Sequence, residues 1–423
     1  MKKTGFLFLS VLLSMCLIAC GNSGSKSGGD GKTVIRLALW DYESVGYDKA
    51  IIEAFEAAHP EYKVDVISSP NADYDQKITT MLTGGDNIDV FYGKSNTAYP
   101  TYVLNGYARN IDDLISKNNF NTAAFGTVLD QHYRIDGKLY ALPYRTNDWV
   151  IFYNKKIFDD ANVPYPSNNM TWEAYRDLAK RVTYGSGDSQ KFGIGFIPRM
   201  GFVVPFIIGK DPNFDIMTSS FDLLKGSIEY YVALQNTDKS YEPYAISKSM
   251  NQDQTYFYRG NTAMLYNGSW FVQMLADNKD KYNFEWGVAK SPYWAGTEQR
   301  GFATSTPVLI NAKTKNADAA WVLLSFICGP EGAAIMAENK MVPSYMNADT
   351  MNIYRASTGI DETSYAALTG NKTYGFGDAN VLMGKISGMM NEELELVITG
   401  NQTPDQCIAN MTKRRQEIIS QGS

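Results

Sequence analysis

Carboxylates are the side chains in this sequence that could perform a reaction on their own, and the chain contains 45 of them. A positioned pair of Asp or Glu residues is sufficient for glycoside hydrolysis, so the composition leaves that reaction open. Other catalytic groups are scarce. The two histidines, His59 and His132, have no nearby constellation of Cys, Asp and Ser for nucleophilic catalysis or zinc binding. We interpret both as solvated surface residues.

Sequence motifs for cofactors are also missing. There is no P-loop, GxSxG, HExxH or EF-hand spacing, and the segment 193–198, GIGFIP, lacks the final glycine of a dinucleotide fingerprint. We therefore expect no cofactor and no metal ion. The net charge of −6 is spread along the chain without basic blocks, which argues against a nucleic-acid partner. Cys328, on a predicted helix, is expected to be a buried apolar residue, and a disulfide scaffold is excluded.

Polar and aromatic residues instead follow predicted strands. The apolar patterns predict strands at 34–40, 64–67 and 88–92 and helices at 47–58 and 75–82. Strands that alternate with helices form a parallel sheet with right-handed crossovers, and ligands bind beyond the carboxyl ends of its strands. This rule singles out Trp40 and Asp41 after the first strand and Asn96 after the third.

The segment 137–183 has the clearest local pattern. Asp136-Gly137 is a turn dipeptide, and the apolar run 149–153 predicts a strand that is buried on both faces. Thr171 is a good N-cap, and the apolar residues after it repeat with helical spacing. The residue pattern alone predicts a strand, a loop and a helix, with Trp172 in the core.

This order of motifs resembles the extracellular solute-binding proteins of ABC importers, in the family-1 group of sugar and oligosaccharide binders. The matching stretches, in chain order, are GGDNIDVFYG, NGYARNIDDLI, GKLYALPY, FYNKKIF, TWEAYRDLAK, YRGNTAMLYNGSW and NADAAWVLLSFICGPEG. They cover nearly the whole mature chain. The resemblance implies an α/β, two-lobed periplasmic-binding-protein fold. Each lobe would be a mostly parallel sheet flanked by helices, and a multi-segment hinge would join the two.

A sugar site between two such lobes needs aromatic faces for the C–H faces of pyranose rings and planar polar groups for adjacent hydroxyls. The resemblance implies that Trp270 stacks on the ligand. This residue follows the turn Asn267-Gly268, and we expect it in the first turn of a helix capped by Ser269. Core packing is the alternative interpretation for this tryptophan.

The resemblance also implies polar contacts from Asn147, at the crossing between the lobes, and from Asp41 and Asn96. Asn96 departs from the family pattern because it replaces a carboxylate. For the further candidates a surface or core position is the alternative. These candidates are Trp40, Tyr144, Arg145, Arg199, Phe202, Asn267, Trp294 and Phe302.

The N-terminus has the pattern of a secretory signal. Lys2 and Lys3 precede a short apolar run at 6–18, which ends in the lipobox-like Leu-Ile-Ala-Cys. We predict a signal peptide at 1–19, lipidation of Cys20, and a flexible Gly/Ser-rich tether over 20–32. An ordinary cleavage site with an incidental cysteine is the alternative.

The length that remains exceeds what one core usually organises, so we expect two domains. The predicted limits are 33–144 and 306–348 for the first lobe, and 145–305 and 349–423 for the second. Trp172 and Trp321 have the helical spacing of core residues.

These observations favour a monomeric receptor that is lipid-anchored to the extracellular face of the cell membrane. We expect it to capture a carbohydrate, an oligosaccharide in particular, by hinge closure and to deliver it to the transmembrane subunits of an ABC permease without catalysis. Two alternatives stay open. One is an extracellular lipoprotein glycosidase, and the other is a binding protein for a non-sugar solute such as a polyamine or glycerol phosphate.

Overall fold

The computed structural model describes residues 31–94, 98–195, 211, 213–249, 254–369, 373–374 and 380–422. The first part of the chain alternates strands and helices, as the apolar pattern predicts. Its elements are β1 (Thr33–Trp40), α1 (Gly46–Ala58), β2 (Tyr62–Ser69), α2 (Tyr74–Gly84), β3 (Val90–Tyr92), α3 (Tyr99–Leu104), α4 (Asp112–Lys117), α5 (Val128–His132), β4 (Arg134–Ile135) and β5 (Lys138–Leu139).

The rest of the chain begins with a long strand and ends with two long helices. Its elements are β6 (Ala141–Asn154), α6 (Lys155–Asp160), α7 (Trp172–Arg181), β7 (Phe192–Gly195), α9 (Lys225–Asn236), α10 (Tyr244–Ser249), β8 (Thr262–Gly268), α11 (Phe271–Asp277), β9 (Trp286–Ala289), β10 (Gly301–Ile310), α12 (Ala317–Cys328), α13 (Pro330–Glu338), α14 (Ala348–Thr358), α15 (Glu362–Leu368), β11 (Thr373–Tyr374), α16 (Met383–Ile398) and α17 (Pro404–Gly422).

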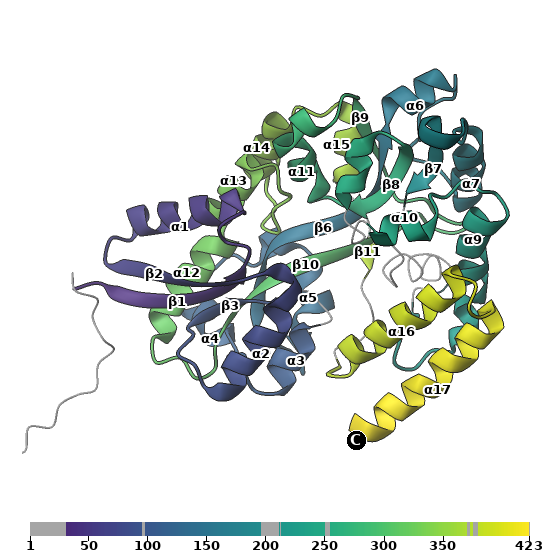
Figure 1. The fold of residues 1–423 in the computed structure, drawn as a ribbon. Helices are drawn as coiled ribbons and strands as arrows, with labels where there is room; N and C mark the ends of the chain where they lie inside the picture. The colour runs from purple at the N-terminus through teal and green to yellow at the C-terminus, as the bar shows by residue number, and fades with distance from the viewer. Residues whose placement is uncertain are drawn as a thin grey trace, which may run out of the picture.

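Two parallel groups of strands are joined by two long antiparallel ones. The main path of the sheet runs β2-β1-β3-β10-β6-β8-β7. β1 is parallel to β2 and β3, and β7 is parallel to β8. β6 and β10 are antiparallel to each other and connect the two groups. Figure 1 shows the two lobes, with β1 to β3 in lobe 1 and β7 to β9 in lobe 2. The predicted fold class is confirmed.

Each lobe has its own hydrophobic packing. One buried cluster takes its residues from 35–144 and 308–345, and a second takes them from 151–302 and 383–411. Trp321 is in the first and Trp172 in the second, so both tryptophans are core residues, as predicted. From this grouping we propose the lobe limits given above, 33–144 with 306–348 and 145–305 with 349–423.

The segment 137–183 folds as its residue pattern predicts. Asp136 and Gly137 have positive φ angles of 51° and 73° and form the turn of the β4–β5 hairpin. The Thr171 side chain accepts a hydrogen bond from the Ala174 amide and caps α7. β6 is longer than the apolar run 149–153, because its polar first half pairs with β10.

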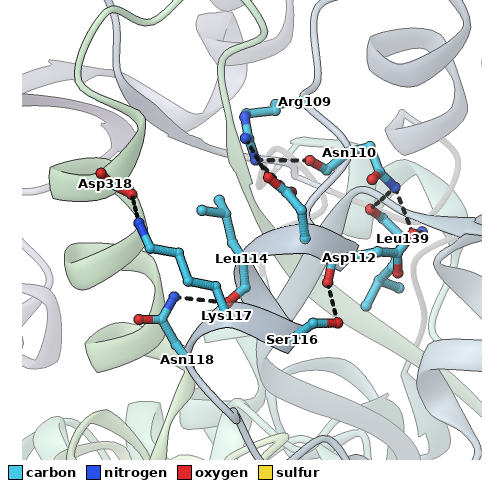
Figure 2. A network of polar contacts seen from close by, with 10 residues as sticks. Arg109, Asn110, Asp112, Leu114, Ser116, Lys117, Asn118, Leu139 and Asp318 are labelled. Atoms are coloured by element: carbon cyan, nitrogen blue, oxygen red, sulfur yellow. Dashed lines mark hydrogen bonds and ion pairs between the residues drawn. The ribbon is translucent and has the colours of Figure 1, made fainter.

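A polar network fixes the short helix α4 in lobe 1 (Figure 2). The Asn110 side-chain amide donates to Asp112 at 2.7 Å and to the Leu139 carbonyl at 3.0 Å. Lys117, in the last turn of α4, pairs with Asp318 of α12 at 2.8 Å. These contacts tie α4 to β5 and to α12.

The C-terminal helices α16 and α17 pack against α9 of lobe 2 (Figure 1). Glu393 of α16 is 4% exposed, and its carboxylate accepts from Arg414 of α17 at 2.7 Å. The side-chain amide of Gln402 donates to the same carboxylate at 2.9 Å. The buried charge is therefore paired within the helix hairpin.

The histidines are less exposed than predicted. The side chain of His59 is 33% exposed and lies 5.0 Å from the Phe55 ring, between ring centroids. His132 is half-buried, and this burial lowers its pKa from 6.5 to about 4. The interpretation of His132 as a solvated residue is wrong, because its side chain is largely removed from water at the end of α5. Cys328 and Cys407 are both buried free thiols.

No single helix in the described part of the chain is long and apolar enough to cross a membrane. One bent pair, Ala317–Cys328 with Pro330–Glu338, passes the same length and composition test.

Candidate functional site

Three chain segments run side by side where the chain passes between the lobes. Residues 145–148 of β6 pair with residues 303–306 of β10. The Thr146 amide also donates to the Val342 carbonyl at 3.0 Å, and the Ser344 amide donates to the Tyr144 carbonyl at 3.1 Å. We call these segments, 144–148, 303–306 and 342–344, the crossing. Backbone pairing holds its strands in register, so the side chains on it have defined positions.

Asn147 lies within the crossing with an unused hydrogen-bonding atom. It is 6% exposed, and its side-chain nitrogen makes a long contact of 3.5 Å with the Thr306 hydroxyl. Its Oδ1 atom is buried and has no hydrogen-bond partner among the described residues. A buried acceptor that stays unpaired costs about 1–3 kcal/mol, so this atom is suited to receive a hydrogen bond from a ligand hydroxyl.

Arg145 links the crossing to the edge of lobe 1. Its Nη1 atom donates to the Tyr47 hydroxyl at 2.7 Å, and its Nε atom donates to the Thr306 hydroxyl at 3.1 Å. The guanidinium lies 5.8 Å from the centre of the Trp40 ring, at the carboxyl end of β1. The guanidinium also lies 5.4 Å from the centre of the buried Tyr144 ring, which precedes Arg145 on β6. The structure therefore brings Trp40, Tyr144 and Arg145 together.

A buried carboxyl group in this cluster was missed by the sequence predictions. Asp48, in the first turn of α1, is 3% exposed and accepts a hydrogen bond from the Tyr92 hydroxyl at 3.1 Å. Burial raises the pKa of Asp48 from 3.8 to about 7, although Arg145 and the Tyr92 hydrogen bond act to lower it. An acid in the first turn of a helix ordinarily indicates a dipole interaction at the surface, so the sequence carried no sign of this burial.

The raised pKa of Asp48 predicts a pH-dependent stability. Between about pH 4 and 7 the folded protein keeps this proton while the unfolded chain loses it, so the free energy of unfolding falls as the pH rises through this window. Asp48→Asn should remove this dependence. At pH 8 the variant should be more stable than the wild type by on the order of 4 kcal/mol, since the pKa of Asp48 is raised from 3.8 to about 7 and one pKa unit corresponds to about 1.4 kcal/mol.

Urea unfolding at pH 5 and pH 8 measures this effect. Asp318→Asn is the matched control, because Asp318 pairs with Lys117 at the surface. An Asp48→Asn variant with the pH profile of the wild type would show that Asp48 is ionised in the folded protein.

Trp270 lies on the lobe 2 side of the crossing. It is half-buried and packs against the hydrophobic cluster of lobe 1 and against a third cluster, to which α11 contributes buried residues. It is the N-cap residue of α11, one position earlier than predicted. The prediction that Ser269 caps this helix is wrong, because its hydroxyl donates to the Thr146 carbonyl of the crossing at 3.3 Å. Ser269 thus fastens the start of α11 to β6.

The other candidates differ in their surroundings. The Asn267 side chain is 3% exposed and accepts from the Gly268 amide at 2.9 Å. Asp41 follows β1 with a φ of 51°, and its carboxylate accepts from the Asn71 amide at 2.9 Å. Phe302 is 1% exposed inside the lobe 2 cluster, and Trp294 packs against Tyr230 at 5.8 Å. These contacts place Phe302 in the core and Trp294 beside α9 of lobe 2.

Three candidates, Asn96, Arg199 and Phe202, lie outside the described residues. Within the described part of the chain, no group of three His, Cys, Asp or Glu residues is arranged to hold a metal ion. A depression of about 730 Å³ occurs elsewhere on lobe 2, lined by residues such as Tyr184, Phe192 and Tyr244. It contains none of the predicted site residues.

The two-lobed fold with its multi-segment crossing defines the class of periplasmic-type binding proteins. A sequence model of the family described as bacterial extracellular solute-binding protein matches residues 41–334, more than half of the chain. The chain therefore belongs to this family and is an extracellular solute-binding protein of the ABC transporter type.

Relatives of this chain bind different solutes. The galactooligosaccharide-binding protein of Bacillus subtilis is 24% identical over an alignment of 358 positions that covers 81% of this chain and 80% of that protein. The sn-glycerol-3-phosphate-binding periplasmic protein of Shigella dysenteriae is 21% identical over an alignment of 433 positions that covers 92% of this chain and 94% of that protein. Among solved structures, an open conformation of a sugar transporter from Rhizobium etli matches with a TM-score of 0.80 and 30% identity. It covers 91% of this chain and 99% of that one.

Proposed function

We propose that this protein captures a neutral oligosaccharide between its two lobes and delivers it to the transmembrane subunits of an ABC importer. The observation that carries this proposal is the buried Oδ1 atom of Asn147 at the crossing, which no described residue pairs with, together with the Trp270 indole on the adjoining lobe 2 edge. An acceptor and an aromatic ring are the two kinds of group that a pyranose requires. The galactooligosaccharide-binding and sugar-transporting relatives support the same ligand class.

The mechanism is a closure of the lobes around the crossing. A ligand that contacts both lobes only in the closed state binds that state more tightly and shifts the population toward it. The site needs no covalent step, and the ligand leaves unchanged. The closed form is then the one that presents a matched surface to the permease.

The N-terminal segment would hold the receptor near its transporter. Lipidation of Cys20 and a flexible tether over 20–32, with a reach of about 20 Å, would keep a monomeric receptor at the outer face of the membrane. A relative from Streptomyces antibioticus that is described as a lipoprotein, 21% identical over 350 aligned positions, supports the lipidation.

Glycerol phosphate is a second candidate ligand. Arg145 is half-buried and forms no ion pair with any described residue, so its guanidinium could receive a phosphate. The glycerol-3-phosphate-binding relative favours the same ligand. Asp48 and the aromatic rings around Arg145 are less suited to an anion, and we rank this ligand second.

A thermal-shift screen separates these ligands. The soluble form starting at Lys32 should be tested with oligosaccharides, monosaccharides, polyamines and glycerol phosphates. A ligand at one hundred times its dissociation constant stabilises the folded state by about 2.7 kcal/mol, which raises the melting temperature by a few degrees. A shift confined to one oligosaccharide series is the expected result. A shift with glycerol phosphate alone would overturn the proposed ligand class.

A further inference from the structure

The indole of Trp270 lies directly against Gly268, two residues earlier in the chain. A Cβ atom added to Gly268 would meet Cζ3 of Trp270 at 1.8 Å and Cη2 at 2.2 Å. Carbon atoms do not approach so closely, so the ring occupies the space in which any larger side chain would begin. Gly268 is not one of the described glycines with a positive φ angle. An alanine side chain at this position would therefore clash with the Trp270 ring, whereas the backbone conformation would allow it.

The ring of Trp149 also contacts the Trp270 indole. Trp149 is the residue paired with Gly268 across β6 and β8, and its ring centroid lies 5.2 Å from that of Trp270 at an interplanar angle of 90°. Side chains of directly paired residues lie on the same face of a sheet. The Trp149 ring itself rests against Tyr266 at 5.7 Å and Phe302 at 6.1 Å. The buried Phe302 ring thus supports the Trp149 ring.

We propose that Gly268 and Trp149 are positioning residues that fix the plane of the Trp270 ring for stacking on the ligand. This inference rests on the proposed function. A ring that is already held in one orientation loses little conformational freedom when a sugar binds to it. The geometry of one glycine and one tryptophan then determines which face of a pyranose the site accepts.

A double-mutant cycle tests this role. Calorimetric titration with a galactooligosaccharide mixture as the probe compares the wild type, Gly268→Ala, Trp270→Ala and the double variant. We expect each single variant to bind at least tenfold more weakly, because each removes the correctly placed ring. The double variant should bind no more than twofold more weakly than Trp270→Ala. A further tenfold loss in the double variant would overturn the proposal, since Gly268 would then act independently of Trp270.

A spectroscopic comparison tests the same idea without any ligand. The edge-to-face tryptophan pair should contribute to the near-ultraviolet circular dichroism spectrum. Gly268→Ala should change the tryptophan bands of the wild type and leave those of Trp270→Ala unchanged. An equal change in both backgrounds would overturn the positioning role. If the wild type does not bind the probe, the proposed ligand class fails, and the spectra still decide the positioning role.

Gly287→Ala is the matched control, because it should destabilise lobe 2 at a site away from Trp270. A Cβ atom at Gly287 would meet the Tyr153 ring at 2.3 Å, and Gly287 pairs with Tyr153 across β6 and β9. Tyr153 is 4% exposed in the lobe 2 core. Gly287→Ala should lower the melting temperature and change the affinity by less than twofold. Equal weakening of binding by both glycine variants would contradict the proposal.

Discussion

Replacing Trp270 with alanine is expected to weaken carbohydrate binding by more than tenfold, or about 1.4 kcal/mol. The indole supplies an aromatic face at the crossing, and its loss leaves the C–H face of a pyranose in contact with water. Because Trp270 is half-buried at the start of α11 and not at the centre of either lobe, the fold should persist. Calorimetric titration with the oligosaccharide identified by thermal shift measures the effect.

Trp286→Ala is the control for the loss of stability that removal of any half-buried tryptophan causes. Trp286 is half-buried on β9, contacts Phe152 at 6.1 Å and donates to the Tyr282 hydroxyl at 3.2 Å. Its removal should lower stability without a change in affinity. If Trp270→Ala binds the sugar as tightly as the wild type does, the stacking role is wrong, and Trp270 only packs between the two lobes.

Replacing Arg259 with methionine is expected to cause the largest loss of stability. Arg259 donates to Glu242 at 2.6 Å, and the Glu242 side chain is 2% exposed in the segment that follows the edge of β7. Removal of one partner leaves the other charge buried and unpaired. The expected cost is about 3 kcal/mol, at the lower end of the range for buried pairs, because the Arg259 side chain is 35% exposed. Urea unfolding measures the loss.

Arg300→Met provides an internal comparison for this effect. The Arg300 side chain is also 35% exposed, but its partner Glu298 is 43% exposed. A pair of this kind contributes about 0–1 kcal/mol. Similar losses in the two variants would mean that Glu242 is readily hydrated or protonated once Arg259 is gone.

Local residue patterns predicted much of the fold. Strong apolar periodicity predicted the strands β1 to β3 and the helices α1 and α2 within about two residues, and Thr171 caps α7 as expected. The length of β6 was not predictable, because residues 141–148 mix polar and apolar side chains and become a strand only by pairing with β10. That pairing partner is more than 150 residues away, and no local signal reports it.

The candidate site could likewise be predicted only where short sequence motifs mark its residues. Trp270 and Asn147 could be selected because each stands in a short motif, NGSW and the segment before FYNKKIF. Asp48 and Trp149 could not, since their importance arises from neighbours on other elements. Asp48 is buried by the approach of β3 and β6 to α1, and Trp149 gains its role from the absent side chain of Gly268. Phe302 was selected for its place near the crossing, and the structure uses it as packing behind Trp149.

The most direct test of the central claim is small-angle X-ray scattering of the soluble form with and without the saturating oligosaccharide. A receptor that closes its two lobes around a sugar should have a smaller radius of gyration when the sugar is bound, and the Trp270→Ala variant should require a higher sugar concentration for the same change. An unchanged radius of gyration at a sugar concentration that saturates binding would contradict capture between the lobes.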